Sequence, residues 1–288
     1  MEKIIMTAPA KINLMLDVTG RRGDGYHTLD TVMQSISLCD TVKISRNRSR
    51  AVTVDCTDKS VPYGELAEKN IVFKAAMAFY GFTGISDIGL HISIEKRIPS
   101  NAGLGGGSSD GAAVISGMNK LYGTELSDGQ LCGIGAKVGA DVPFCITGGT
   151  MICSGIGEIM SPATPLKDCF IVIGKGSGGI STAEAYEKID RLELSERFNY
   201  LLYDGTPNSL KKTGGNIFEA VTENQDVSKI KKICADNGAE YSAMSGSGSA
   251  VFGLFCRQKE AVDCSLCLKE QNFFSEVCKP LPYGARSV

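Results

Sequence analysis

The sequence predicts an α+β fold, because strand signals and helix signals are mixed along the whole chain. Several segments alternate apolar and polar residues with a period of two, as half-buried strands do; the clearest are 4–18, 51–56 and 88–98. Others space their apolar residues as an amphipathic helix does, among them 70–82 and 110–123. With 288 residues, the chain is long enough for a large core and two domains.

The first predicted strand, residues 4–18, has two unlike faces. Its aliphatic side chains fall on one face, while Lys11, Asn13 and Asp17 fall on the other. A solvated strand surface and a functional face explain the polar side equally well. The glycine turn that follows, RRGDGYH at 21–27, connects two strands.

Two aromatic rings stand at the tip of that turn, on Tyr26 and His27. Together they can stack on a flat base and hydrogen-bond to it, although side chains at turn tips often only pack. Further along, Asn70 stands in front of the helical segment 70–82, where its side chain can cap the helix.

A glycine-rich stretch, IPSNAGLGGGSSDGAA at 98–113, joins the strand 88–98 to the helix 110–123. No lysine follows it, and the G-x-G-x-x-G spacing is absent, so neither familiar nucleotide motif applies. Main-chain N–H groups at a helix start favour an anion, and Ser108 and Ser109 add hydroxyl donors. Phosphate binding is favoured over a structural turn. Asp110 either belongs to the first helical turn or faces a magnesium ion.

Beyond this stretch the predicted elements continue to alternate. A helix is expected over 127–139, and residues 140–155 are expected to form a turn and a strand. The composition then shifts to proline and polar residues near 160–168, which indicates a domain boundary. The remaining expected elements are a strand at 169–174, helices near 182–204, 214–223 and 227–238, and a second glycine turn that leads into a strand at 244–255.

Two polar groups in this half have competing interpretations. Asp141 lies in the apolar stretch 138–145, where an acid is either a helix cap or a functional group, and the two are equally supported. Ser181 and Glu184 have the spacing of a capping box, with Thr182 beside them. A plain helix cap is favoured there.

Composition excludes several function classes. The formal net charge is −2, which offers no basic groove for nucleic acid. No run of eighteen apolar residues and no convincing signal peptide are present, so no membrane partner is expected. Eleven scattered cysteines predict free thiols and a cytoplasmic protein. The pair Cys264 and Cys267 is interpreted as helix packing rather than as a metal site, because only two histidines are available to complete one.

Taken jointly, four segments resemble the GHMP small-molecule kinase superfamily. They are APAKINLMLDVTGRRGDGYHTLDTVMQSISLCD (8–40), IPSNAGLGGGSSDGAA (98–113), GADVPFC (139–145) and SGSGSAVFGLF (245–255), in the order of the family. The first two together are highly specific. Asn101 stands where glycine or alanine is usual, and Gly111 where alanine is usual; neither departure removes a presumed functional side chain.

The resemblance implies a two-domain architecture with the active site in the cleft between the domains. Residues 1–163 are expected to be the ATP-binding domain and residues 164–288 the substrate-binding domain. The implied activity is ATP-dependent phosphorylation of the 2-hydroxyl of a cytidine diphosphate derivative of methylerythritol, with Mg²⁺ accompanying ATP. This small-molecule substrate belongs to a non-mevalonate route to isoprenoid precursors. The sequence leaves the oligomeric state and the magnesium ligands open.

The resemblance also assigns residues to roles. Lys11 and Asp141 match the catalytic pair, in which the acid takes the proton of the attacking hydroxyl and the ammonium offsets developing charge. Positions that line the substrate site in the family are matched by Asn13, Tyr26, His27 and Thr182, with Tyr26 and His27 at the cytosine. The ATP side is matched by Asn70 and Lys96 near adenine and by the loop residues Pro99, Ser100, Asn101, Ala102, Gly103, Leu104, Gly105, Gly106, Gly107, Ser108 and Ser109.

Two alternative functions remain. One is a GHMP kinase for a small alcohol such as homoserine or mevalonate, which would have no pyrimidine for Tyr26 and His27 to contact. The other is a nucleotide-binding regulator without catalysis, which the presence of both Lys11 and Asp141 argues against.

Overall fold

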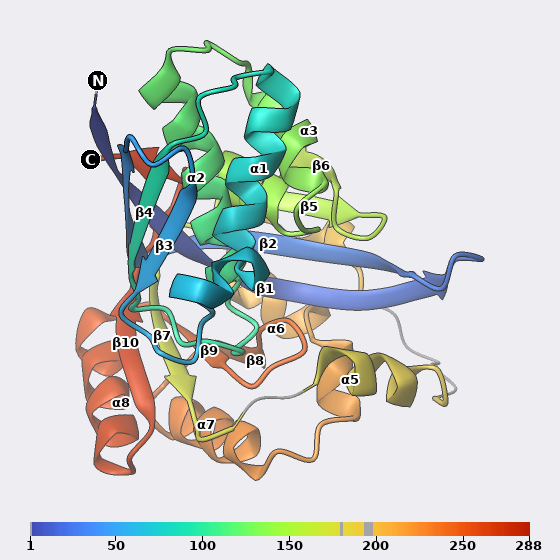
Figure 1. Ribbon diagram of the computed structural model, residues 1–288. Coiled ribbons are helices and arrows are strands. Elements are labelled where there is room, and N and C mark those ends of the chain that lie inside the picture. Colours follow the sequence, from blue (N-terminus) through green and yellow to red (C-terminus); the bar gives the residue numbers. More distant parts are fainter. Residues whose placement is uncertain (1, 179–180, 193–197) are drawn as a thin grey trace.

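The computed structural model describes residues 2–178, 181–192 and 198–288, which form a mixed α/β molecule with two sheets (Figure 1). The large sheet has the order β12-β1-β2-β4-β3, with β11 and β5 also paired to β2 and β6 paired to β5. Its strands are β1 (Lys3–Arg21), β2 (His27–Arg46), β3 (Val52–Cys56), β4 (Leu90–Glu95), β5 (Thr150–Ser154), β6 (Ile159–Pro162), β11 (Pro280–Leu281) and β12 (Arg286–Ser287).

The small sheet has the order β10-β7-β9-β8 and is antiparallel throughout. Its strands are β7 (Phe170–Lys175), β8 (Tyr241–Met244), β9 (Val251–Phe255) and β10 (Phe274–Cys278). The α-helices are α1 (Ile71–Thr83), α2 (Gly106–Tyr122), α3 (Asp128–Ala136), α4 (Val142–Thr147), α5 (Thr182–Ile189), α6 (Pro207–Thr213), α7 (Gln225–Asp236) and α8 (Gln258–Glu270). Within the described ranges, no helix is long and apolar enough to cross a membrane.

Three apolar clusters hold these layers together. One packs α1 and α2 against the large sheet, and another packs α7 and α8 against the small sheet. The third lies between the sheets, where Ile12 and Leu14 of β1 share a cluster with Phe252 of β9. The two halves are therefore packed through a common core, which fixes β1 relative to the turn between β8 and β9.

The chain passes from the large sheet to the small one between β6 and β7, at residues 163–169. The predicted boundary between residues 163 and 164 falls in this connection. The last nine residues, 280–288, return to the large sheet, because β11 pairs with β2 and β12 pairs with β1. The division into two functional domains stays a prediction.

Most elements of the first half form where the sequence predicts them, but residues 142–147 do not. They form helix α4, where a turn leading directly into a strand was expected. The helix has Pro143 near its start and ends at Thr147, and the φ of 68° at Gly148 takes the chain out of the helix before β5.

The helices predicted in the second half were partly wrong. The segment 182–204 holds α5, which ends at Ile189, and a 3₁₀ turn at Tyr200–Leu202; residues 193–197 lie outside the described part. The segment 214–223 holds only a 3₁₀ turn at Ile217–Ala220, because it begins with two glycines. Helix α6 lies just before it.

The start of α6 carried a signal that the prediction missed. Thr206 caps the helix through its side chain, which accepts a hydrogen bond from the Ser209 amide, and Pro207 is the first helical residue. A capping threonine followed by proline is a standard helix start.

The predicted cap of α1 is confirmed, and it can be tested. The Oδ1 atom of Asn70 accepts a hydrogen bond from the Val72 amide at 3.0 Å, and its Nδ2 donates to the Pro62 carbonyl at 2.7 Å. We expect Asn70→Ala to lower the free energy of unfolding by about 1 kcal/mol in urea titrations. Asn70→Ser keeps a cap acceptor and should lose less; equal losses in the two variants would contradict a capping role.

Candidate active site

Two glycine-rich loops meet at the centre of the molecule. The first glycine loop, residues 98–109, follows β4, and the second, residues 245–250, connects β8 to β9. The Ser245 hydroxyl donates to the Gly103 carbonyl at 2.8 Å, and the Ala250 amide donates to the Ala102 carbonyl at 3.0 Å. A Cβ atom on Gly103 would lie 2.0 Å from the Ser245 carbonyl oxygen, so only glycine allows this approach.

The first glycine loop is also fixed against β1. The Lys11 amide donates to the Leu104 carbonyl at 2.9 Å, and the Ser109 hydroxyl donates to the Pro9 carbonyl at 2.7 Å. Gly105 has a φ of 66°, and a Cβ there would lie 2.8 Å from Cγ of Lys11. Helix α2 begins within the loop at Gly106, so its first amides belong to the glycine run. Ser109 is thus engaged inside the protein.

Lys11 and Asp141 form an ion pair, with Nζ and Oδ2 3.4 Å apart. The Lys11 side chain is 6% exposed, whereas that of Asp141 is 31% exposed. Asp141 occupies the position before α4, yet its side chain makes no capping hydrogen bond. The helix-cap interpretation is therefore wrong. A solvated strand surface is wrong as well, because Lys11, Asn13 and Asp17 are all buried.

Asn13 holds the Lys11 ammonium in place. Its Oδ1 accepts from Nζ of Lys11 at 2.7 Å and from the Gly246 amide at 3.0 Å. Its Nδ2 donates to the Thr31 hydroxyl at 2.9 Å. These three bonds join β1, β2 and the second glycine loop at one side chain, which leaves the ammonium directed toward Asp141.

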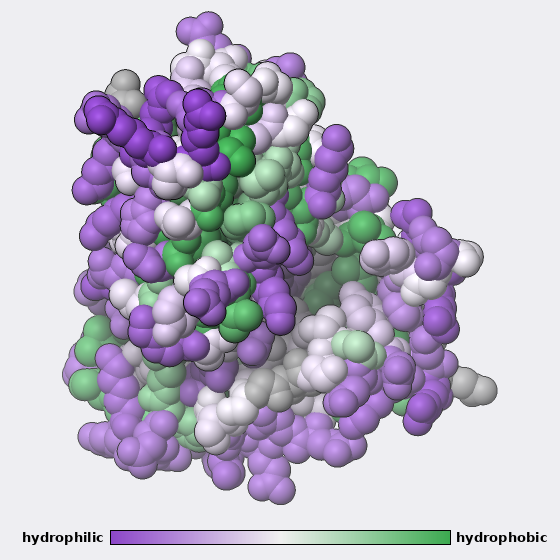
Figure 2. Space-filling view, viewed as in Figure 1, coloured by the Kyte–Doolittle hydropathy of each residue, from purple (hydrophilic) through white to green (hydrophobic). Residues whose placement is uncertain are grey.

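Two cavities open on either side of the first glycine loop. The larger, of about 660 Å³, contains Lys11, Asn13 and Asp141 in its wall, and residues from both halves of the chain line it. The smaller, of about 500 Å³, contains Asn70 and Lys96 and the loop residues from Pro99 to Ser108. The walls of both include Asn101, Gly103, Gly105, Ser108 and Thr182. Figure 2 shows this face hollowed between the part that carries α1 and the part that carries α5.

Helix α5 begins beside the larger cavity. The Ser181 side chain accepts a hydrogen bond from the Glu184 amide at 3.4 Å, as the expected cap requires. Thr182, the first helical residue, contacts Ser247 of the second glycine loop through their hydroxyls, 2.8 Å apart. Thr182 therefore lies where the walls of the two cavities meet.

The turn at 21–27 reaches α5 through His27. The imidazole stacks on the Tyr186 ring, with centroids 4.4 Å apart, and its Nε2 lies 2.7 Å from Oδ1 of Asp190. The hydrogen bond from His27 lowers the pKa of Asp190, and Arg21 adds to this from 3.0 Å. Tyr186 lines the larger cavity, whereas Tyr26 and His27 do not, and Tyr26 is 60% exposed.

Sequence reasoning missed Tyr186, Asp190 and Asp40. No motif marks them, because their partners lie far away in the sequence: His27 and Asp190 are 163 positions apart. Asp40 belongs to a buried cluster in which Lys96 also contacts Asp110. Asp110 lies in the body of α2 and is directed toward Lys96, so the alternative in which it faces magnesium finds no support.

In the described ranges the cysteines pack as small apolar side chains or lie at the surface. Cys264 is buried on α8 with its Sγ 3.9 Å from that of Cys234, as expected for helix packing. Across the part of the chain that the structure describes, no group of three or more His, Cys, Asp or Glu residues could hold a metal ion. All eleven cysteines are free.

Comparison with known families gives two matches along the chain. The model of the GHMP kinases N terminal domain matches residues 70–149, and that of the GHMP kinases C terminal domain matches residues 201–272. Among curated proteins, the 4-diphosphocytidyl-2-C-methyl-D-erythritol kinase of Acetivibrio thermocellus is 42% identical over 268 residues, covering 91% of this chain and 93% of that protein. The kinase of the same name from Caldicellulosiruptor saccharolyticus is 37% identical, covering 92% and 93%.

Solved structures give the same picture of the fold. A crystal structure of 4-(cytidine 5'-diphospho)-2C-methyl-D-erythritol kinase superposes with a TM-score of 0.78 at 27% identity, covering 99% of this chain and 98% of that one. The homoserine kinase of Cytophaga hutchinsonii superposes with a TM-score of 0.76 at 18% identity, covering 100% and 98%. The latter likeness concerns the fold alone.

Proposed function

The chain belongs to the GHMP kinases, and on this premise we propose that it phosphorylates the 2-hydroxyl of 4-diphosphocytidyl-2-C-methyl-D-erythritol with ATP. Family membership makes it an ATP-dependent phosphotransferase that acts on a hydroxyl group. The choice of substrate is supported by relatives of 37–42% identity that carry this kinase's name over about nine-tenths of the chain. This reaction belongs to the synthesis of isoprenoid precursors by a route other than mevalonate.

The observation that carries the proposal is the ion pair of Lys11 and Asp141 beside the first glycine loop. Asp141 is the more exposed partner and lines the larger cavity, where an acceptor hydroxyl has room to approach. In the reaction, the hydroxyl oxygen bonds to the γ-phosphorus, the bond from that phosphorus to the bridging oxygen of ADP breaks, and Asp141 takes the hydroxyl proton.

Lys11 supplies positive charge at the same point. Its ammonium is fixed by Asn13 before substrate arrives, so no reorganisation is needed when charge develops on the transferring phosphoryl group. Phosphoryl transfer has a loose transition state, which makes positioning by Lys11 and Asn13 as important as proton removal.

ATP occupies the smaller cavity in this proposal, with adenine near Asn70 and Lys96. Its phosphates cross the first glycine loop to reach the larger cavity, since both cavities share the loop as a wall. The first amides of α2, which begins at Gly106, favour the negative charge of the phosphates. Ser108 adds a hydroxyl, while Ser109 supports the loop from behind.

The residues present do not build a resident magnesium site. Among the described residues no acidic cage exists, and the carboxylates of Asp40 and Asp110 are engaged with Lys96. Magnesium then arrives as part of MgATP, held by phosphate oxygens and water.

The substrate's pyrimidine lies toward the turn at 21–27 in this proposal. Tyr26 is exposed at its tip, and His27 and Tyr186 are already stacked beside the larger cavity. Asn13 and Thr182 contact the part of the substrate nearest the reacting hydroxyl. In this proposal residues 1–163 bind ATP and also contribute Asn13, Tyr26 and His27 to the substrate site, and residues 164–288 contribute Thr182 and Tyr186. The enzyme is cytoplasmic in this proposal.

One assay separates the proposed function from its alternatives. Purified protein is given MgATP with 4-diphosphocytidyl-2-C-methyl-D-erythritol, homoserine or mevalonate, and ADP release is recorded. We expect turnover with the cytidine derivative alone. Turnover with homoserine or mevalonate instead would indicate another GHMP kinase, and turnover with none of the three would indicate a regulator.

A further inference from the structure

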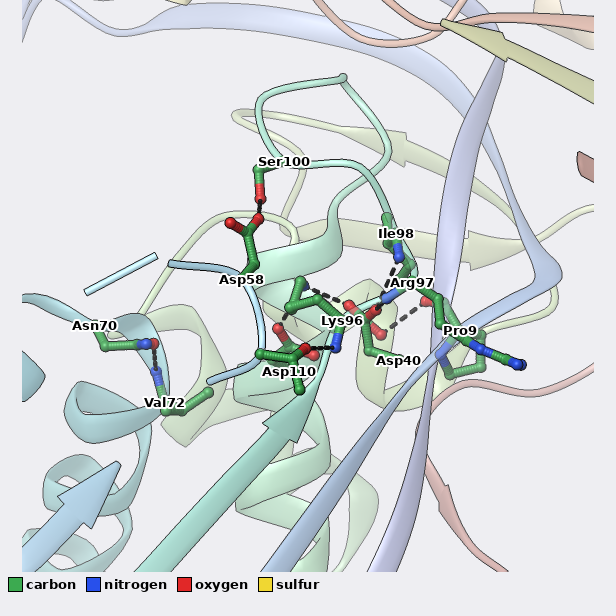
Figure 3. A network of polar contacts seen from close by, with 12 residues as sticks. Pro9, Asp40, Asp58, Asn70, Val72, Lys96, Arg97, Ile98, Ser100 and Asp110 are labelled. Atoms are coloured by element: carbon green, nitrogen blue, oxygen red, sulfur yellow. Dashed lines mark hydrogen bonds and ion pairs between the residues drawn. The ribbon is translucent and has the colours of Figure 1, made fainter. Parts of the chain in front are cut away.

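Three ionisable side chains form a buried cluster behind the first glycine loop (Figure 3). The Lys96 ammonium lies between Oδ2 of Asp40 and Oδ2 of Asp110, with the latter contact at 2.7 Å. The side chains of Lys96, Asp40 and Asp110 are 7%, 0% and 3% exposed. Charges so poorly solvated are costly unless they are paired and their net charge is small.

The cluster ties the two ends of the first glycine loop to one point. Lys96 stands where the loop leaves β4, and Asp110 lies in α2 just after the loop ends. Asp40 comes from β2 and accepts hydrogen bonds through Oδ1 from the amides of Arg97 at 2.5 Å and Ile98 at 2.8 Å. The entry and the exit of the loop are therefore held by the same group of charges.

The two carboxyl groups of the cluster differ in their hydrogen-bond partners. Asp40 accepts hydrogen bonds from three donors with its two oxygens. Asp110 accepts a hydrogen bond from Lys96 through Oδ2, and among the residues that the structure describes its buried Oδ1 has no hydrogen-bond partner. Burial raises the pKa of Asp110 to about 8, Lys96 opposes this rise, and the charge of Asp40 adds to it.

The other titratable groups near the cluster do not add a second cation beside Asp110. Cys56 of β3 and Cys145 of α4 both interact with Asp110, and burial raises the pKa of each thiol, which keeps them neutral. Asp58 also interacts with Lys96, and the pKa of Asp58 is lowered mainly by hydrogen bonds from Ser60. The Lys96 ammonium is thus paired with two buried carboxyl groups, those of Asp40 and Asp110.

We propose that Asp110 holds a proton at neutral pH and that the neutral Asp40–Lys96–Asp110 cluster positions the first glycine loop for ATP. With Asp40 and Lys96 charged and Asp110 protonated, the net charge of the cluster is zero. Loss of the proton leaves one negative charge behind the loop, beside the cavity that Lys96 and Asp110 both line. This inference rests on the proposed ATP site, and it makes Asp110 a positioning residue rather than a catalytic one.

The test is the pH dependence of ATP binding. Above the pKa of Asp110 the added negative charge repels the phosphates, so the KM for ATP and the Kd from calorimetry should both rise with pH. Between pH 7 and pH 9.5 we expect the KM and the Kd for ATP to rise roughly three- to tenfold. This is the effect expected when one negative charge repels the phosphates across about 10 Å of partly screened protein. MgATP does not change charge in this range, so the rise belongs to the protein.

Asp110→Asn is the decisive variant, because asparagine resembles the protonated acid and cannot ionise. Its KM for ATP should stay level from pH 7 to pH 9.5. Asp236→Asn, on the exposed surface of α7, is the matched control and should keep the wild-type rise. A rise that persists in Asp110→Asn, or a wild-type KM that is level across the range, would overturn the proposal.

A second measurement detects the protonated carboxyl group of Asp110 in the wild-type protein, without any substitution. Infrared difference spectra of the wild-type protein between pH 7 and pH 9.5 should show loss of the carbonyl stretch of a protonated carboxylic acid. A spectrum without this band contradicts the proposal even if Asp110→Asn does not fold. Failure of the proposed function can be told apart from failure of this proposal. A protein that does not bind or use ATP at any pH gives no KM, but its infrared spectrum should still show the band of protonated Asp110.

Discussion

Asp141→Asn is expected to lower turnover by roughly 10²- to 10⁴-fold, the range for a positioned acid–base group. The amide cannot take the hydroxyl proton, and it removes the negative partner that lies 3.4 Å from the Lys11 ammonium. The KM for ATP should change little, because Asp141 lines the larger cavity and not the smaller one. Initial rates of ADP release at saturating substrate measure the effect.

The structure makes this variant easy to interpret. Asp141 makes no capping hydrogen bond and is partly exposed, so its replacement removes no stabilising cap. Lys11 keeps Asn13 as a partner. Because the buried ammonium loses its ion pair, the melting temperature should decrease, but the protein should stay folded at the assay temperature. Asp128→Asn, in the exposed first turn of α3, should keep full turnover. Wild-type turnover in Asp141→Asn would remove this residue from the mechanism.

Local patterns in the sequence predicted the parts of the site that consist of backbone. Glycines between a strand and a helix indicated an anion site, and the structure places them between two cavities. The alternation in β1 placed Lys11 and Asn13 together, and the structure joins them by a hydrogen bond. These features depend on neighbouring residues, so a single segment contains the information.

Pairings between distant segments could not be predicted in this way. From the residues alone, Asp141 was as much a helix cap as a functional acid, and the structure excludes the cap because the side chain pairs with Lys11 of β1 instead. Asp40 had no pattern at all, since its donors lie 56 to 58 positions away. Family resemblance supplied Asp141 as a candidate but was silent on Asp40 and Asp190.

The second half of the chain shows that the length of a helix cannot be predicted from its own sequence pattern. Periodicity predicted a long helix after Ser181, whereas α5 ends at Ile189. An amphipathic pattern predicts where a helix gains from packing, but its length depends on which surface is available to cover. The small sheet leaves α7 and α8 a broad face to pack on, while α5 lies at the edge of the larger cavity.

Gly103→Ala is expected to reduce both stability and turnover. The backbone at Gly103 has a φ of 75°, and a methyl group there would lie 2.0 Å from the Ser245 carbonyl oxygen. Strain in this region costs about 1–3 kcal/mol for a residue other than glycine, before the clash itself is counted. The two glycine loops must separate, which breaks the bond from the Ser245 hydroxyl to the Gly103 carbonyl.

Separation of the loops acts on the chemistry through Asn13. The second glycine loop donates to Asn13 from Gly246, and Asn13 in turn holds the Lys11 ammonium. A displacement of about 1 Å at such a point can cost on the order of 10²-fold in rate, so we expect a loss of that size in ADP release. Urea titration of the same variant should show a decrease of about 2 kcal/mol or more in the free energy of unfolding.

Gly133→Ala separates this mechanism from a general effect of adding a methyl group. Gly133 is exposed within α3, and nothing lies within 4 Å of the Cβ position. Alanine there should stabilise the protein by about 0.5–1 kcal/mol, because glycine is the poorer helix former. If Gly103→Ala behaves like Gly133→Ala, close contact between the two loops is not what positions Lys11, and the ammonium must be held by β1 and β2 alone.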